Sequence, residues 1–336
     1  MSVISSLFTG TLALIVLSAV IAPFESLGWY AGWFGSSDQE IPPDEPSATV
    51  IEDDGEGTAE VPGHFLVYLS GVGAIAANSI PDEEVPFIRG LEETLPATRV
   101  ISDLFPYSVT NIGLTGQRVT ARVWRWLERL RLDNPMALAA FIVNLRNMIQ
   151  VTISADRRYG PIYNLGVARA MRASLLRHGY RIGSGTPVTL LGWSGGGQIA
   201  LGAAWYLPGM IGAPVYVVSV GGVMSDDIGL KHMQHLWHLW GQKDPLAPLG
   251  KWLYAGRWKV FSSSVWNRAL AQGKITMIPL GPFTHNGKGN YFDNESTLPT
   301  GETHMQHVLA RVRGVLAEAD LIPAQPQKDV ERLSPE

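Results

Sequence analysis

The sequence predicts an α/β fold, in which a mostly parallel central sheet has helices on both faces. Three observations lead to this prediction. Short, continuously apolar segments alternate along the chain with longer segments that have the spacing of amphipathic helices. Within the apolar segments, polar residues do not alternate with apolar ones, which is typical of strands buried on both faces. The chain has 336 residues, of which 46% are hydrophobic, so it can form a large core in one domain or two.

The predicted strands and helices begin just after residue 61. The strands are the apolar runs at residues 64–70, 98–106, 187–191, 214–220, 235–240 and 275–280. The helices are expected at residues 83–94, 117–132, 136–149, 163–178, 198–206 and 303–318. Because helices connect most successive strands, the strands are expected to run parallel.

The chain begins with an uncharged, mostly apolar run at residues 3–23. As a helix, about 20 residues rise roughly 30 Å, the thickness of the hydrocarbon core of a bilayer. Aromatic residues follow at positions 29–34, where a membrane interface would lie. We therefore predict a single-pass membrane anchor over residues 1–35. The alternatives are a cleaved signal peptide, whose basic start is missing here, and a buried core helix. Because no Lys or Arg precedes Arg89, the side of the membrane is left open.

An acidic linker is predicted at residues 36–60, which contain nine Asp or Glu together with Pro, Ser and Gly. Such a composition buries too little apolar surface to fold, so we expect disorder there. The folded domain is then expected over residues 61–322, followed by a polar tail at 323–336. Lys and Arg are spread along this domain rather than clustered, so nucleic acid is not expected as a partner.

The chain has no cysteine. This excludes disulfide scaffolds, zinc sites with Cys ligands, iron–sulfur clusters and thiol nucleophiles. No metal and no organic cofactor are expected, and the sequence leaves the oligomeric state open.

The strongest chemical signal is the Gly-x-Ser-x-Gly motif at Gly192–Gly196, with Ser194 at its centre. It stands between the predicted strand 187–191 and the predicted helix 198–206. A sharp strand-to-helix turn strains its central residue, so the neighbours must lack bulk, and the serine hydroxyl projects above the sheet. The N–H of Gly195, at the start of the helix, can stabilise an oxyanion there. A glycine-rich structural turn is the alternative.

With this motif in this context, the chain resembles the α/β-hydrolase superfamily over about residues 61–320. Short segments at 256–258, 266–269 and 285–293 are similar to membrane-anchored bacterial members. The resemblance implies that an acid and then a histidine follow the serine in the chain. Asp244, in Gly-Gln-Lys-Asp-Pro-Leu after the strand 235–240, is the implied acid, and Asp226 and Asp227 are the alternatives. An ordinary Asp-Pro turn is the other interpretation of Asp244.

The resemblance places the histidine on the loop after the last strand, where His285 stands. His304 and His307, at the start of the last predicted helix, are the competitors. A lone histidine is more often a structural polar residue than a catalyst, and only order and spacing favour His285. The remaining histidines are interpreted as structural: His64, His178, His232, His235 and His238.

A second oxyanion donor is expected from the turn after the first strand, Ser70-Gly71-Val72-Gly73. The backbone N–H of Val72 is the best candidate, although many members of the superfamily have His-Gly at this turn. The same stretch weakly resembles a dinucleotide-binding fingerprint. That function needs an acidic residue at the end of a second strand, whereas Asp103 falls in mid-strand, so it is disfavoured.

About 80 residues separate the second and third predicted strands, more than one crossover helix needs. We therefore predict a cap insertion at about residues 110–160. Its helix 117–132 has a basic face and an apolar face, so it packs on the sheet or lies on an anionic membrane; the first is favoured. The helix 136–149 is expected to line an acyl pocket.

Together these patterns predict a membrane-anchored serine hydrolase that cleaves carboxylic esters with lipid-like or small apolar acyl groups. In this mechanism Ser194 attacks, His285 takes its proton, Asp244 orients the imidazole, and Gly195 and Val72 hold the oxyanion. The alternative is a non-catalytic protein of the same fold that binds an apolar ligand or a protein partner. Thioester, amide and acyl-transfer chemistry stay open, as does acyl chain length.

Overall fold

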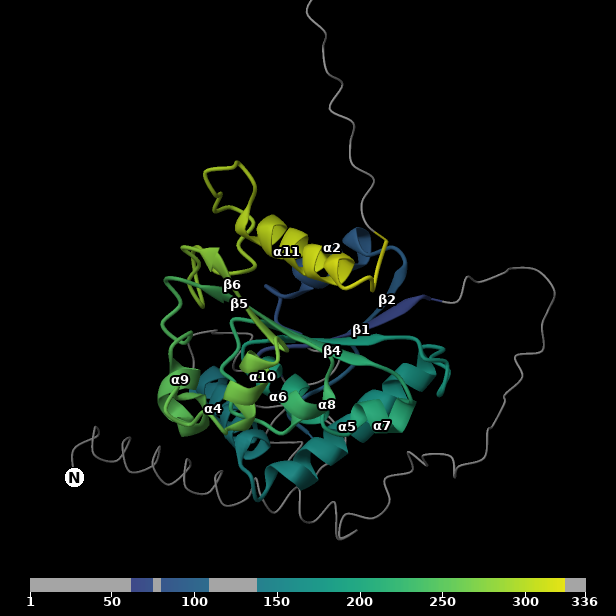
Figure 1. Cartoon of the computed structure of the whole chain (residues 1–336). Helices are drawn as coiled ribbons and strands as arrows, with labels where there is room; N and C mark the ends of the chain where they lie inside the picture. The colour runs from purple at the N-terminus through teal and green to yellow at the C-terminus, as the bar shows by residue number, and fades with distance from the viewer. Residues whose placement is uncertain (1–61, 75–79, 109–137, 324–336) are drawn as a thin grey trace, which may run out of the picture.

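The computed structural model describes residues 62–74, 80–108 and 138–323 (Figure 1). It shows an α/β architecture with one six-stranded sheet in the order β2-β1-β3-β4-β5-β6, and every neighbouring pair is parallel. The predicted α/β class and the parallel sheet are confirmed. The predicted anchor 1–35, the linker 36–60 and the helix 117–132 lie outside the described residues, as does nearly all of the tail.

The strands fall within two residues of their predicted bounds, with one exception. They are β1 His64–Leu69, β2 Thr98–Ile101, β3 Val188–Trp193, β4 Val215–Val220, β5 Leu236–Gly241 and β6 Ile275–Gly281. The exception is β2, which was expected to reach residue 106. Within the described part of the sheet it is an edge strand that pairs with β1 alone, and their pairing ends at Val67 with Ile101.

Helices cover both faces of the sheet (Figure 1). Helices α2 Val85–Thr94 and α11 His304–Glu318 lie on one face, and α4 Leu138–Ala155, α5 Gly160–Arg177 and α6 Gly195–Ala203 lie on the other. The prediction for α4 was wrong at its end, because the helix continues six residues beyond 149. Short helices were not predicted: α7 Leu207–Ile211, α8 Gly229–His232, α9 Leu249–Leu253, α10 Val265–Ala271 and the 3-10 turn η1 Ala255–Arg257.

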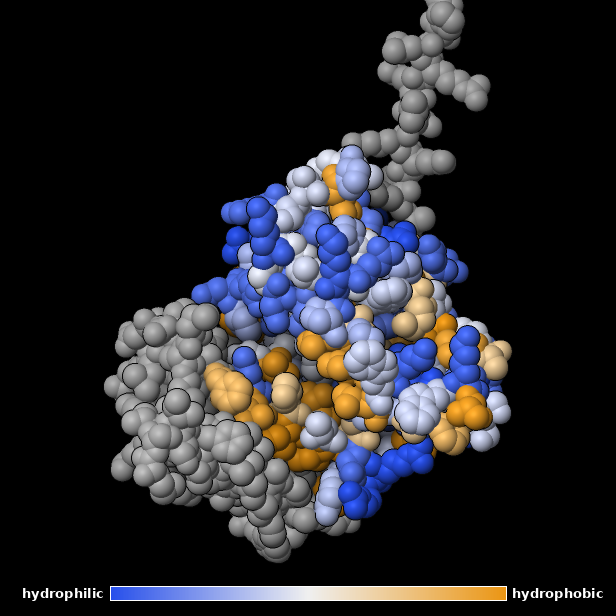
Figure 2. All heavy atoms as spheres, turned by 90° about the vertical axis from the view of Figure 1, so that its left-hand side faces the viewer, coloured by the Kyte–Doolittle hydropathy of each residue, from blue (hydrophilic) through white to orange (hydrophobic). Residues whose placement is uncertain are grey.

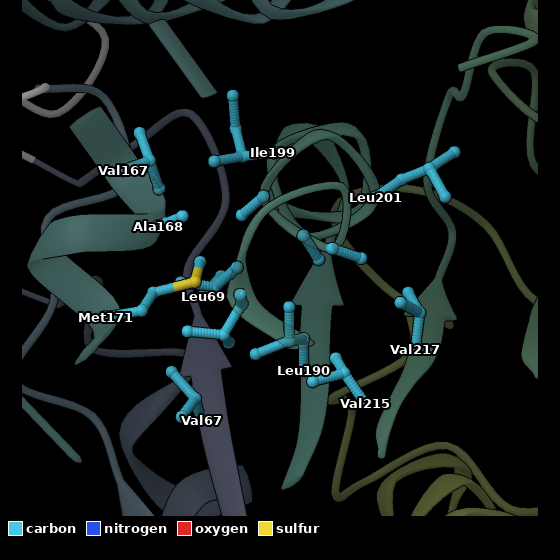
Figure 3. Packing of buried hydrophobic residues seen from close by; sticks show 14 of the residues in the cluster. Val67, Leu69, Val167, Ala168, Met171, Leu190, Ile199, Leu201, Val215 and Val217 are labelled. Carbon is cyan, nitrogen blue, oxygen red and sulfur yellow. The ribbon is translucent and has the colours of Figure 1, made fainter. Parts of the chain in front are cut away.

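Two hydrophobic clusters, one on each face, hold the sheet between the helix layers. Figure 3 shows part of the cluster around α6, where Leu190 of β3 points toward the helices and Val217 of β4 packs beside it. All six residues of β1 and all six of β3 are buried. Strand β3 is therefore closely packed up to its carboxyl end, and the turn that follows it has little freedom to move.

No helix within the described ranges has both the length and the apolarity that a bilayer crossing requires.

Candidate active site

Strand β3 turns directly into helix α6 at Ser194, which separates the last strand residue from the first helical one. Ser194 has φ 51° and ψ −119°, a left-handed conformation that is rare for a residue with a side chain. Such a residue costs about 1–3 kcal/mol and persists only where its surroundings fix it. A Cβ on Gly192 or on Gly196 would lie less than 3.0 Å from backbone atoms, so glycine is required on both sides.

The three residues predicted as nucleophile, base and acid lie in one hydrogen-bonded row. The Oγ atom of Ser194 is 2.9 Å from Nε2 of His285. On the other side of the ring, Nδ1 of His285 is 2.8 Å from Oδ2 of Asp244. All three side chains are nearly buried. They follow β3, β6 and β5, so the parallel sheet brings three distant segments of the chain together at the carboxyl ends of its strands.

Asp244 is placed to keep the imidazole in one tautomer. Burial by itself would raise the pKa of this carboxyl, but hydrogen bonds from His285, Tyr291 and the Leu246 N–H outweigh burial and hold the pKa below its usual range. An ionised Asp244 accepts from Nδ1–H, which leaves the lone pair of Nε2 directed at the hydroxyl of Ser194. The imidazole of His285 can therefore take a proton from the hydroxyl of Ser194.

Tyr291 is a part of the site that the sequence reasoning missed. Its hydroxyl donates to Oδ2 of Asp244 at 2.8 Å and accepts from the N–H of Gly241 at 2.6 Å. Burial, with the nearby charge of Asp244, raises the pKa of Tyr291 far above its usual value, so the phenol stays a neutral donor. Nothing local in the sequence marks this residue, because a tyrosine six positions after a histidine has no spacing signal.

Trp193 fixes the imidazole from one face. The indole ring stacks on the ring of His285 with 4.8 Å between centroids and 18° between planes. Trp193 is itself buried and contacts the rings of Tyr291 and Phe292 edge-on. The variable position before the serine thus determines where the imidazole can lie.

The two predicted oxyanion donors lie side by side. A Cβ placed on Gly195 would come within 2.8 Å of Cγ1 of Val72 and 2.8 Å of Cγ2 of Val151 in α4. Among the described residues, the N–H groups of Val72 and Gly195 donate to no acceptor. The turn after β1 and the start of α6 therefore lie close together beside Ser194, and their two N–H groups are candidates for binding an oxyanion.

Three buried side chains hold the turn after β1 in place. Glu84 accepts from the N–H of Gly71 at 3.1 Å and from the hydroxyl of Tyr68 at 2.7 Å. The amide of Asn147 in α4 donates to the carbonyl oxygens of Val72 and Ala74, each at 2.7 Å. The third side chain is that of Tyr107, whose hydroxyl donates to the carbonyl oxygen of Ser70 at 2.8 Å. These hydrogen bonds use the carbonyl oxygens of Ser70, Val72 and Ala74 and the N–H of Gly71, so the turn is held without using the N–H of Val72.

Glu84 should make folding stability depend on pH. Burial raises the pKa of Glu84 to about 8, against 4.5 for the ordinary group. The unfolded chain then loses its proton first, so the free energy of unfolding should fall between about pH 4.5 and pH 8, by up to about 1.4 kcal/mol per pH unit. Urea unfolding at a series of pH values measures this slope, and Glu84→Gln, which cannot ionise, should flatten it. An unchanged slope in that variant would assign the pH dependence to other groups.

The alternative acids lie elsewhere. Asp226 forms an ion pair with Arg157 at 2.6 Å, while Asp227 accepts from the Gln198 amide at 3.1 Å and from the N–H of Gly229 at 2.8 Å. Both line a cavity of about 600 Å³ whose lining includes neither Ser194 nor His285. Burial raises the pKa of Asp227 to about 6.

The competing histidines are engaged away from Ser194. His304 stacks on Phe283 with 4.0 Å between ring centroids, and its Nδ1 lies 3.0 Å from the Gly289 carbonyl oxygen. His307 is half-buried, with Nδ1 2.8 Å from a carboxylate oxygen of Glu302. His64 lies between the hydroxyls of Thr98 and Thr189, inside the sheet.

No protein-family model and no curated protein matches this chain. Within the described ranges, no three His, Asp or Glu side chains group together in a way that could hold a metal ion. The arrangement of Ser194, His285 and Asp244 can generate a serine alkoxide equivalent beside two N–H groups that have no acceptor among the described residues, which fits the chemistry of acyl transfer.

Proposed function

We propose that the chain is a serine hydrolase with an α/β-hydrolase fold, tethered to a membrane by its N-terminal segment 1–35, and that it cleaves carboxylic esters. The observation that carries the proposal is the hydrogen-bonded row from Ser194 Oγ through His285 to Asp244, beside a strained strand-to-helix turn. A protein that only binds a ligand has no need for a serine held in a costly backbone conformation against an oriented imidazole.

The reaction follows from the positions of these atoms. Oγ of Ser194 forms a bond to the ester carbonyl carbon as Nε2 of His285 takes the hydroxyl proton. The carbonyl electron pair moves to oxygen, where the N–H groups of Gly195 and Val72 stabilise it. When the C–O bond breaks, the imidazolium returns the proton to the leaving alkoxide. Water, deprotonated by His285, then cleaves the acyl-enzyme and releases the acid and free Ser194.

An apolar acyl group fits the residues beside the nucleophile. Methyl groups of Val72 and Val151 border the space at Gly195, and Val151 belongs to α4, in the segment that we interpret as a cap insertion. Apolar surroundings favour an apolar substrate group because burying it removes its surface from water. This supports lipid-like or small apolar acyl esters as the substrate class.

Covalent labelling tests the proposal. A fluorophosphonate probe should label Ser194 of the folded full chain, and heat-denatured protein should not be labelled, because the probe needs an activated serine. Ser194→Ala should abolish the label, while Ser184→Ala, an exposed serine at the far end of the sheet, should keep it. If the folded chain takes no label, the binding protein without catalysis becomes the better interpretation.

Removing the Tyr291 hydroxyl should slow turnover without much change in KM. Tyr291→Phe takes one hydrogen bond from the Asp244 carboxylate, a loss of about 1.5–3 kcal/mol for a charged acceptor, so kcat should fall about 10- to 100-fold. The acidic limb of the pH profile of kcat should also shift, which a purely structural loss would not produce. Tyr180→Phe, whose hydroxyl bonds the Thr186 carbonyl far from Ser194, is the matched control. Equal kcat values for the two variants would show that the Tyr291 hydroxyl does not contribute to turnover.

A further inference from the structure

Large apolar side chains are exposed on one short segment that follows the Asp244 loop. Trp252 and Leu253 at the end of α9 are 69% and 64% exposed. Beyond η1, Val260 is 77% exposed, and Trp258 and Phe261 are 43% and 47% exposed. Single exposed apolar residues are common, but five within ten positions form an apolar surface of the kind that marks an interaction site.

The backbone of this segment, residues 251–261, is held by hydrogen bonds from the side chains of Trp258 and Asn267. The indole N–H of Trp258 donates to the carbonyl oxygen of Lys251 at 2.6 Å, which ties the two ends of the segment together. The side-chain amide of Asn267 in α10 donates to the carbonyl oxygens of Trp258 and Phe261 at 2.8 and 2.9 Å. The rings of Trp258 and Phe261 are stacked with 6.0 Å between centroids. The exposed side chains thus stand on an ordered backbone.

The charges beside these apolar residues are positive. Lys251 and Lys259 are exposed and adjoin Trp252 and Trp258 in the chain. No Asp or Glu occurs between Asp244 and Asp293, whereas that stretch contains six Lys or Arg. The carboxylate of Asp226 approaches this segment at Gly256, and it is paired with Arg157. Asp244 itself is buried against His285.

The segment lies at the same edge of the sheet as Ser194. It follows the carboxyl end of β5, and Ser194 follows the carboxyl end of the parallel strand β3. Figure 2 looks toward this edge and shows apolar residues gathered across the middle and lower right of the surface, with hydrophilic residues between them. The upper part of the same face is mostly hydrophilic.

We propose that the segment docks on the surface of an anionic phospholipid bilayer; its contact residues, the docking surface, are Lys251, Trp252, Leu253, Trp258, Lys259, Val260 and Phe261. Tryptophan favours the level of the headgroups, leucine, valine and phenylalanine enter the acyl boundary, and each nearby lysine is attracted to anionic lipid. The uncharged segment 3–23 keeps the domain close to a bilayer under the proposed function, on which this inference rests. Docking turns the edge that carries Ser194 toward lipid esters.

A site-specific depth probe tests this docking. Because the full chain has no cysteine, Val260→Cys gives a single thiol for a nitrobenzoxadiazole label. The matched control is Ile182→Cys, 44% exposed on the loop before β3 and therefore at the opposite edge of the sheet. Each full-length labelled chain is reconstituted in phosphatidylglycerol–phosphatidylcholine vesicles with and without doxyl-labelled lipids. We expect a blue shift and strong quenching at position 260 and neither at 182.

The charge requirement is measured in the same system. Replacing Lys251 and Lys259 with Glu in the labelled Val260→Cys chain should reduce quenching at 260 severalfold, as should vesicles of phosphatidylcholine alone or high salt. No quenching at 260 in anionic vesicles would overturn the proposal. So would equal quenching at 182, which would indicate non-specific association, or a blue shift without vesicles, which would indicate a protein partner or a second copy.

The result is separable from the hydrolase proposal. Fluorophosphonate labelling reports Ser194 in the absence of lipid, and Ser194→Ala leaves the docking surface unchanged. Quenching at position 260 in a chain that does not react with the fluorophosphonate would support docking and contradict catalysis. A chain that reacts with the fluorophosphonate but shows no quenching at 260 would support catalysis and contradict docking.

Discussion

His285→Ala should lower kcat for hydrolysis of a p-nitrophenyl ester by about 10⁴- to 10⁶-fold. The imidazole is the only base within hydrogen-bond distance of Oγ of Ser194 among the described residues, and without it the hydroxyl stays protonated at neutral pH. The residual rate would come from the oxyanion donors and from substrate binding. Steady-state kinetics measures kcat, and circular dichroism checks that the fold is intact.

The control for this variant is His307→Gln, because both histidines follow the last strand. His307 is paired with Glu302 and not with Ser194, so its loss should leave kcat within a few-fold. A large loss in His307→Gln together with an active His285→Ala chain would transfer the role of base to the terminal helix and would contradict the arrangement described above.

Gly192→Ala should be the most destabilising single methyl addition at the turn around Ser194. The new Cβ would lie less than 3.0 Å from backbone atoms of Gly196 and Gly197, and neither segment can move away, because β3 is central in the sheet and α6 is buried along its whole length. Overpacking of this kind costs about 1–3 kcal/mol and sometimes more. The midpoint of urea unfolding measures the loss, and ester hydrolysis should fall with it.

Gly209→Ala is the matched control, since a Cβ on Gly209 in α7 would meet nothing within 4 Å. Alanine favours helix by about 1 kcal/mol over glycine, so this variant should be unchanged or slightly more stable. If Gly192→Ala were as stable as Gly209→Ala, the close approach of β3 and α6 would be wrong.

Much of the fold could be predicted because its signals are local. A run such as residues 187–191 is apolar except for Thr189, which favours a strand buried on both faces, and glycines on both sides of Ser194 suit a sharp turn. The edge strand β2 was predicted too long because its length depends on where β1 stops pairing, and that is a property of the partner. The short helices α7 to α10 have too few residues to show a period.

Ser194 was predicted from its own motif, whereas Asp244 and His285 were implied by the family resemblance that this motif supports, and the parallel sheet explains why the three residues meet. Ser194, Asp244 and His285 each follow a strand, and in a parallel sheet the carboxyl ends of strands meet at one edge. Tyr291 and Glu84 could not be found in this way, because each acts through a contact across the fold and carries no spacing signal. The catalytic roles stay predictions until the labelling and kinetic experiments are done.

The strand order has a consequence for folding kinetics. Strands β3 to β6 pair with neighbours that follow soon in the chain, whereas β1 pairs with β3 across a stretch that includes α2, β2, α4 and α5. His64 and Thr189, which are in contact, are 125 residues apart. Closing long loops costs entropy before contacts repay it, so high contact order slows assembly. If the proposed ester hydrolysis is present, its recovery during refolding should follow the pairing of β1 with β3, because the turn that carries Val72 follows β1.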